Sequence, residues 1–167
     1  MLTTNGLIFD ERRIIESTRR IAYQIYEANF DCDVLYLVGI ANNGLRYAER
    51  LKTCLEKISP LNVELVQVKL DKKNPLNAVD CSIELKTIEN QSVVIVDDVL
   101  NTGSTLMYAV KYFLDVPLKR LRTAVLVNRN HKKYPIKGDY KGISLSTTLN
   151  EHIEVRFDGK NPGVYLT

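Results

Sequence analysis

One segment predicts the architecture of this chain: Val93-Val94-Ile95-Val96-Asp97-Asp98-Val99-Leu100-Asn101-Thr102-Gly103-Ser104-Thr105. Its four leading aliphatic residues, all of them β-branched, are typical of a buried parallel strand. Two carboxylates follow where that strand should end, and a turn of small, hydroxyl-bearing residues leads into an amphipathic helix through Leu106, Val110 and Phe113. Ligands of open α/β sheets bind outside the carboxyl ends of strands, and a helix N-terminus offers free N–H groups to an anion. The segment therefore predicts an anion site flanked by acids. The alternative is a core strand that ends in two solvated acids.

The composition is that of an ordinary globular protein: 167 residues, 45% hydrophobic and 26% charged. This length fits one domain, which we expect to span residues 1–167. The three cysteines show no metal-like spacing and are interpreted as packing thiols in a reducing compartment. No signal peptide and no apolar run of the ~18 residues that a membrane span needs are present, so we expect a cytoplasmic protein without a membrane partner. The motif Gly-x-x-x-x-Gly-Lys-Ser/Thr is absent, which excludes a P-loop nucleotide site.

Positive charge is unevenly distributed, although the net charge is only +3. Residues 119–141 contain eight Lys or Arg and one acid, Asp139, which leaves a local charge of 8 − 1 = +7. A second group of four arginines lies within residues 12–20. Patches of this kind bind pyrophosphate, bind nucleic acid or simply face water.

Hydrophobic periodicity and turn residues predict strands that alternate with helices. Asp10 is a suitable N-cap for a helix over residues 11–29, and Pro60 ends a second helix over residues 45–58. Strands are expected at residues 7–9, 34–40, 63–70, 81–85, 93–96 and 121–127, with short β segments at 153–157 and 164–166. This alternation predicts a parallel sheet flanked by helices, with a β-rich C-terminal cap over its carboxyl edge.

The central segment resembles the phosphoribosyl-pyrophosphate (PRPP) motif of type I phosphoribosyltransferases, which is a hydrophobic strand, Asp-Asp and then Thr-Gly-x-Thr. A second segment, Leu126-Val127-Asn128-Arg129-Asn130-His131-Lys132-Lys133-Tyr134-Pro135-Ile136 followed by Asp139-Tyr140-Lys141-Gly142, is similar to the C-terminal hood of the PyrR family. Members of that family bind mRNA as pyrimidine-operon attenuators and carry uracil phosphoribosyltransferase activity. The resemblance implies a type I phosphoribosyltransferase fold whose hood comprises about residues 129–167 and the N-terminal strand.

The same resemblance implies a reaction in which PRPP and uracil, with Mg²⁺, give UMP and pyrophosphate. Breaking the bond to the anomeric carbon places negative charge on the pyrophosphate, so electrostatic preorganisation should supply most of the rate. Asp97 and Asp98 are assigned to the ribose hydroxyls and are the residues nearest any metal, which otherwise binds through PRPP. The remaining assignments are a 5′-phosphate cradle (Leu100, Asn101, Thr102, Gly103, Ser104, Thr105), a pyrophosphate loop (Ala41, Asn42, Asn43, Gly44) and a base-covering part of the hood (Arg129, Asn130, His131).

The chain departs from the PyrR pattern at three places. The pyrophosphate loop, usually Lys-Thr-Arg-Gly, is Ala41-Asn42-Asn43-Gly44 and lacks both cations, which predicts reduced activity. The loop after the strand at 63–70 reads Asp71-Lys72-Lys73, and its lysines are candidates to replace a missing cation or are simply solvated. Asn128 and Asn130 replace Asp and Gly in the hood.

These departures leave two other functions open. One is a nucleotide-sensing regulator of pyrimidine genes that binds RNA and has weak or no catalysis. The other is a purine phosphoribosyltransferase that takes a different nucleobase. In each case the resemblance implies a homodimer or a higher homo-oligomer.

Overall fold

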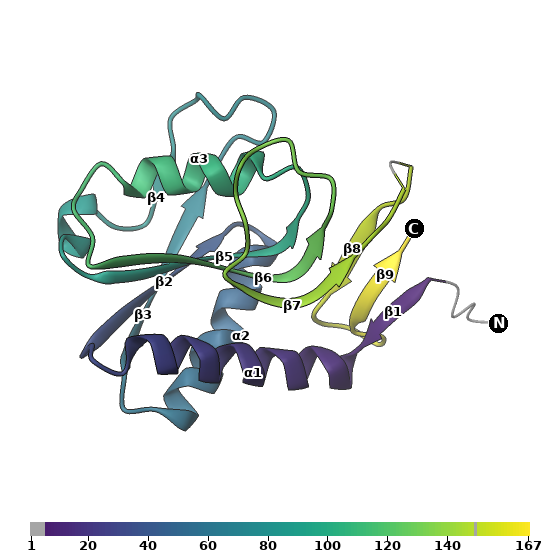
Figure 1. Ribbon diagram of the computed structural model, residues 1–167, viewed down its shortest axis with the longest axis horizontal. Coiled ribbons are helices and arrows are strands. Elements are labelled where there is room, and N and C mark those ends of the chain that lie inside the picture. Colours follow the sequence, from purple (N-terminus) through teal and green to yellow (C-terminus); the bar gives the residue numbers. More distant parts are fainter. Residues whose placement is uncertain (1–5, 149) are drawn as a thin grey trace.

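The computed structural model describes residues 6–148 and 150–167, in which two β-sheets are present (Figure 1). The larger sheet has six strands in the order β4-β3-β2-β5-β6-β7, and the smaller sheet has three in the order β1-β9-β8. The strands are β1 (Leu7–Asp10), β2 (Val34–Ile40), β3 (Asn62–Lys69), β4 (Asp80–Cys81), β5 (Ser92–Leu100), β6 (Arg120–Arg129), β7 (Tyr140–Leu145), β8 (Ile153–Arg156) and β9 (Gly163–Leu166).

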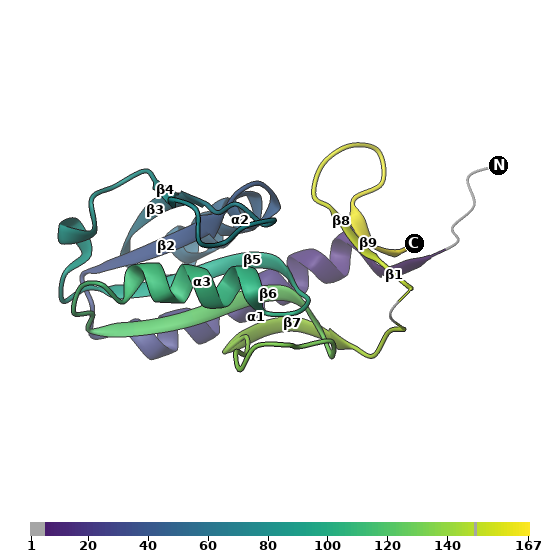
Figure 2. The ribbon, with the colours of Figure 1, turned by 90° about the horizontal axis from the view of Figure 1, so that it is seen from above.

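The larger sheet is parallel from β3 to β7, and only the two-residue β4 runs antiparallel at its edge. Three α-helices flank it: α1 (Glu11–Asn29), α2 (Asn43–Ile58) and α3 (Ser104–Phe113). Figure 1 shows α1 and α2 on one face of the sheet and α3 on the other, and Figure 2 shows the small sheet beyond one end of this layered body. The predicted architecture, a central parallel sheet flanked by helices with a small β-rich addition, is confirmed.

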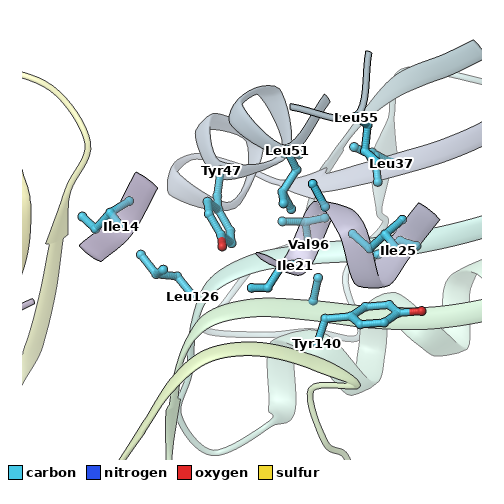
Figure 3. Close-up of a cluster of buried hydrophobic side chains, with 14 of the residues drawn as sticks. Ile14, Ile21, Ile25, Leu37, Tyr47, Leu51, Leu55, Val96, Leu126 and Tyr140 are labelled. Carbon is cyan, nitrogen blue, oxygen red and sulfur yellow. The ribbon is translucent and has the colours of Figure 1, made fainter. Parts of the chain in front are cut away.

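Two buried clusters, one on each face of the sheet, hold the layers together. Figure 3 shows the larger cluster, in which Ile21 and Ile25 of α1 and Tyr47 and Leu51 of α2 pack toward Val96 of β5. On the other face, Leu106, Ala109 and Phe113 of α3 pack against the sheet. The apolar residues at helical spacing in the sequence are these buried positions. Their burial is the main favourable contribution to the fold.

Helix α1 begins and ends where the sequence predicts. The carboxylate of Asp10 accepts a hydrogen bond from the backbone N–H of Arg13 at 2.9 Å, so Asp10 caps the helix as expected. Helix α2 begins at Asn43, two residues before the predicted start, and ends as predicted at Ile58. It is capped by Ser59, whose hydroxyl donates to the carbonyl of Leu55 at 2.7 Å.

Three predicted β elements differ from the structure. Strand β5 continues past the acids to Leu100, because its pairing with β6 extends to Leu100 and Asn128. The strand predicted at 81–85 is only β4 followed by a 3₁₀ helix (Leu85–Ile88). Of the segment predicted as hood, β7 joins the central sheet, and β8 and β9 form the small sheet with β1.

Strands β2 and β5 lie side by side in the centre of the sheet, and the chain turns in opposite directions after them. After β2 it crosses one face through α2 to β3, and after β5 it crosses the other face through α3 to β6. The order of the strands therefore reverses between β2 and β5, and a crevice for ligands forms at such a point. In the described residues, no helix is long and apolar enough to cross a membrane.

Candidate functional site

A cavity of about 290 Å³ lies at the carboxyl end of β5. Its walls come from β5, the turn that follows, α3, β6, β8 and the loop after β3. The lining residues are Lys72, Asp97, Asp98, Val99, Leu100, Asn101, Thr102, Gly103, Thr105, Leu106, Val125 and Ile153. The acid pair, the turn and Lys72 supply polar groups to the cavity, and Leu106, Val125 and Ile153 supply apolar side chains.

The acid pair forms one wall of this cavity. Asp97 is only 6% exposed, and its Oδ1 accepts a hydrogen bond from the backbone N–H of Asp98 at 2.9 Å. Burial, and then the neighbouring charge of Asp98, raise the pKa of the Asp97 carboxyl well above its usual range. Two carboxylates held this close favour a cation or hydroxyl donors between them, because either would relieve their repulsion.

The predicted pyrophosphate loop, which follows β2, contacts the acid pair at the end of β5. The side-chain amide of Asn43 donates to Asp98 Oδ2 at 3.2 Å and to the carbonyl of Val155 in β8 at 3.1 Å. Gly44 permits this approach, since a Cβ there would lie 2.7 Å from the carbonyl oxygen of Val96 and 3.0 Å from Asp97 Oδ1. The peptide bond between Ala41 and Asn42 in this loop is cis. Asn43 thus connects the acid pair to the small sheet.

The turn between β5 and α3 has the form of an anion cradle. Gly103 has φ +88°, a left-handed conformation that glycine adopts without strain. Thr102 Oγ1 accepts from the N–H of Ser104 at 3.3 Å, and the first helical bond runs from the N–H of Met107 to the carbonyl of Gly103. The N–H groups ahead of that bond lack helical partners, and such groups bind phosphate at helix N-termini.

The segment after β6 supports this turn from outside. The carbonyl of Thr102 accepts from the N–H groups of Lys133 and Tyr134, at 2.8 and 3.1 Å. A Cβ on Gly103 would collide with the Ile136 side chain. The hood sequence noted above therefore packs against the predicted phosphate cradle.

Arg129 is buried and directs its guanidinium at protein acceptors. Its Nη1 donates to Asn101 Oδ1 at 3.0 Å, and its Nε donates to Thr147 Oγ1 at 2.9 Å. Its Nη2 donates to the carbonyls of Thr148 and Glu151, at 3.2 and 2.7 Å. Arg129 thus ties the end of β5 to the connection between β7 and β8, which gives it a structural role beside the base-covering one predicted for it.

The structure brings most of the predicted site residues to one place. Seven line the cavity (Asp97, Asp98, Leu100, Asn101, Thr102, Gly103, Thr105), and Ser104 is bonded to Thr102. Asn43 hydrogen bonds to Asp98, and Gly44 lies against Asp97. Arg129 reaches the rim through Asn101, whereas Asn130 and His131 are not among the lining residues and hydrogen bond to the connection at Ser146 and Thr147. The chemical roles of all these residues remain predictions.

Sequence reasoning missed the apolar part of the lining. Val125, Leu106 and Ile153 come from three elements far apart in the chain and meet only in the folded structure. Each has the local pattern of an ordinary core residue, so no sequence signal distinguishes it. Lys72 was noted as a candidate cation, and the structure places it at the cavity.

The chain matches the phosphoribosyl transferase domain over residues 5–159. It is 34% identical over 159 residues to the bifunctional protein PyrR of Macrococcus caseolyticus, covering 91% of each chain. It is 32% identical to that of Haemophilus ducreyi, covering 92% of each. Among solved structures, it is similar to a hypoxanthine-guanine phosphoribosyltransferase from Bacillus anthracis (TM-score 0.79, 16% identity, 98% and 97% of the two chains). It is also similar to the hypoxanthine phosphoribosyltransferase of Trypanosoma cruzi (TM-score 0.78, 18% identity, 97% and 95%). At these identities the solved structures show the fold alone, and they confirm the predicted type I phosphoribosyltransferase fold.

Proposed function

Since this chain belongs to the phosphoribosyl transferase family and, within it, to the PyrR proteins, we propose that it transfers the phosphoribosyl group of PRPP to uracil, giving UMP and pyrophosphate. Family membership makes it a pentosyltransferase. The observation that carries the proposal for the site is the shared cavity. The buried Asp97 and the half-buried Asp98 line the same space of about 290 Å³, at the carboxyl end of β5, as Thr102, Gly103 and Thr105 of the following turn.

Each part of PRPP has a complementary part of this cavity. The 5′-phosphate would bind the N–H groups and hydroxyls of the turn, where the N-terminal end of α3 favours negative charge. The ribose hydroxyls would donate to Asp97 and Asp98. The base would then lie toward the apolar wall formed by Val125, Leu106 and Ile153. This order places the anomeric carbon between the acid pair and the hood.

The reaction exchanges one bond at the anomeric carbon for another. The bond from that carbon to pyrophosphate breaks, and its electron pair leaves with the pyrophosphate. A ring nitrogen of uracil supplies the electron pair for the new carbon–nitrogen bond and loses its proton to water. The ribose gains positive charge on the way, and the carboxylates of Asp97 and Asp98 stabilise that charge through the hydroxyls that they hold.

The residues present fit Mg²⁺ as the cofactor. Burial and the neighbouring charge of Asp98 raise the pKa of Asp97, so a cation beside the two carboxylates would favour their charged forms. Hard oxygen ligands of this kind suit Mg²⁺. No cluster of three or more His, Cys, Asp or Glu side chains that could hold a metal occurs in the described part of the chain. Asp97 and Asp98 would therefore hold the ion together with oxygens of PRPP. Bound there, Mg²⁺ would neutralise charge on the pyrophosphate.

The test is release of pyrophosphate from PRPP and Mg²⁺ with uracil, hypoxanthine, guanine, xanthine and adenine in turn. Release with uracil alone is expected. Release with a purine alone would replace uracil by the purine alternative and leave the pentosyltransferase class intact. Absence of release with every base would contradict the proposed reaction.

RNA binding is a second candidate function, and exposed lysines favour it. Of the eight basic residues in 119–141, Lys119 and Arg120 pair with Asp31, Arg122 pairs with Asp139, and Arg129 is buried. The other four, Lys132, Lys133, Lys137 and Lys141, are exposed. The free positive charge is thus smaller than the sequence suggests, but it is concentrated after β6.

Filter binding of uridine-rich hairpins at two salt concentrations tests this second function. Specific binding predicts that affinity for the cognate hairpin exceeds affinity for a scrambled one at both concentrations. Nonspecific phosphate attraction predicts an equal fall for both RNAs as salt increases.

We also propose that residues 1–167 form one domain and that the chain assembles as a homodimer or a higher homo-oligomer, as the PyrR resemblance implies. Light scattering at micromolar concentration measures the assembly, and a monomeric mass would contradict it.

A further inference from the structure

The loop after β3 is ordered by a single carboxylate. Asp71 Oδ1 accepts hydrogen bonds from the N–H groups of Lys73 and Asn74, at 2.9 and 3.2 Å, and Oδ2 accepts from the side-chain amide of Asn77 at 2.8 Å. The amide of Asn74 in turn donates to Asn77 Oδ1 at 3.1 Å. These bonds lower the pKa of Asp71 and close residues 71–77 into a compact turn.

This turn places its two adjacent lysines differently. Lys72 lines the cavity together with Asp97 and Asp98, and its positive charge favours the charged form of Asp97. Lys73, which is exposed as Lys72 is, does not line the cavity. Sequence alone does not distinguish the two lysines, whereas the structure does.

The cavity is short of positive charge for a substrate that carries a diphosphate. Lys72 is the one cation among the cavity-lining residues of the described chain. Arg129 is buried, and its guanidinium donates to Asn101 and to the connection between β7 and β8. In residues 41–44 the polar side chains are two asparagines, and one of them, Asn43, is bonded to Asp98.

We propose that Lys72 is a substrate-binding residue that contacts the diphosphate of PRPP and neutralises the pyrophosphate as it leaves. The proposal rests on the proposed function of the same cavity. Negative charge increases on the pyrophosphate oxygens as the bond to the anomeric carbon breaks. An ammonium group held at the cavity by an ordered turn therefore binds the transition state more tightly than the ground state. Lys72 supplies from the β3 side the charge that the Ala41–Gly44 loop lacks.

The experiment compares Lys72→Ala with Lys73→Ala, which removes an identical charge one residue away. Kinetics with uracil measure kcat and the KM for PRPP, and calorimetry measures the binding of Mg²⁺-pyrophosphate. We expect Lys72→Ala to lower kcat/KM for PRPP and the affinity for pyrophosphate by about 10- to 100-fold each, the loss typical of one charge-assisted contact. Lys73→Ala should stay within about 2-fold of the wild-type protein, since Lys73 does not line the cavity and its exposed charge is screened by salt.

Lys72→Arg should restore most of the affinity because it returns a cation to the same turn. Equal behaviour of Lys72→Ala and Lys73→Ala would overturn the proposal. Both lysines are exposed, so melting temperatures near the wild-type value should confirm that all variants fold. If the wild-type protein releases no pyrophosphate with any base, the proposed reaction fails. The calorimetric comparison of the two alanine variants then still decides whether Lys72 binds the diphosphate.

Discussion

Replacing Arg129 by methionine separates its structural role from a role in base recognition. The guanidinium donates to four protein oxygens, besides its contact with the His131 ring. Two of these oxygens, Thr147 Oγ1 at 2.9 Å and the Glu151 carbonyl at 2.7 Å, belong to partly buried residues. Asn101 and Thr148 are exposed, so water replaces the arginine at those two positions. Methionine keeps a long apolar stem and removes every donor.

The expected loss follows from the two partly buried bonds. A hydrogen bond from a charged donor contributes about 1.5–3 kcal/mol, so their loss should lower the free energy of unfolding by about 3–6 kcal/mol. For a chain of 167 residues, each kcal/mol corresponds to about 2–4 °C in Tm. The Tm of Arg129→Met should therefore fall by about 6 °C or more.

Thermal unfolding followed by circular dichroism measures this loss, with Arg122→Met as the matched control. The Arg122 side chain is 49% exposed and lies 3.7 Å from the Asp139 carboxylate, so its loss should cost at most about 1 kcal/mol. If Arg129→Met melts within ~2 °C of the control while the KM for uracil rises more than ~10-fold, Arg129 contacts the base and the structural account of it is wrong.

Three further changes test other parts of the site. Burial and the charge of Asp98 raise the pKa of Asp97, so the folded chain holds that proton more tightly than the unfolded chain, and stability falls as pH rises above the ordinary value of 3.8. Asp97→Asn should therefore raise the Tm at pH 7–8 and leave it unraised near pH 3. The same change should lower the rate of pyrophosphate release by at least ~100-fold. A lower Tm at pH 7–8 would refute the argument about the Asp97 pKa. Gly103→Ala places a Cβ on a residue at φ +88° and against the Ile136 side chain. The free energy of unfolding, measured with denaturant, should therefore fall by about 1–3 kcal/mol. Unchanged stability together with unchanged PRPP affinity would contradict the role of this turn as a phosphate cradle. Chelation of Mg²⁺ with EDTA should abolish pyrophosphate release without changing the Tm of the protein alone, because no metal-binding cluster occurs in the described residues; a large fall in Tm would indicate a structural metal.

Local sequence signals predict the elements that carry their own start and stop residues. Helix α1 is predicted residue for residue because Asp10 caps it and its apolar residues recur at helical spacing. Strand β2 is likewise predicted over its full length, since it is an apolar run between Asp33 and the turn at Asn42, Asn43 and Gly44. The cavity follows from the same kind of signal, because the acids and the glycine turn are contiguous in the chain.

The errors lie where distant partners determine the structure. Strand β5 extends beyond Asp98 because β6 continues to pair with it, and β7 was missed because Gly142 weakens a short pattern that only the neighbouring β6 stabilises. The predicted strand at 81–85 ends early because the N–H of Gln67 in β3 donates to the Ser82 hydroxyl. A continued strand would offer this N–H a backbone carbonyl. The position of Lys72 and the bonds of Arg129 are likewise long-range facts that no local pattern contains.

The most direct test of the central claim is the rate of pyrophosphate release from PRPP and uracil in the presence of Mg²⁺, measured for the wild-type chain and for the double variant Asp97→Asn/Asp98→Asn. The account predicts release by the wild-type chain and a loss of at least ~100-fold in the double variant, which should remain folded because asparagine preserves the shape of both side chains. Equal rates for the two proteins would contradict the assignment of the acid pair, and so would release that does not depend on uracil.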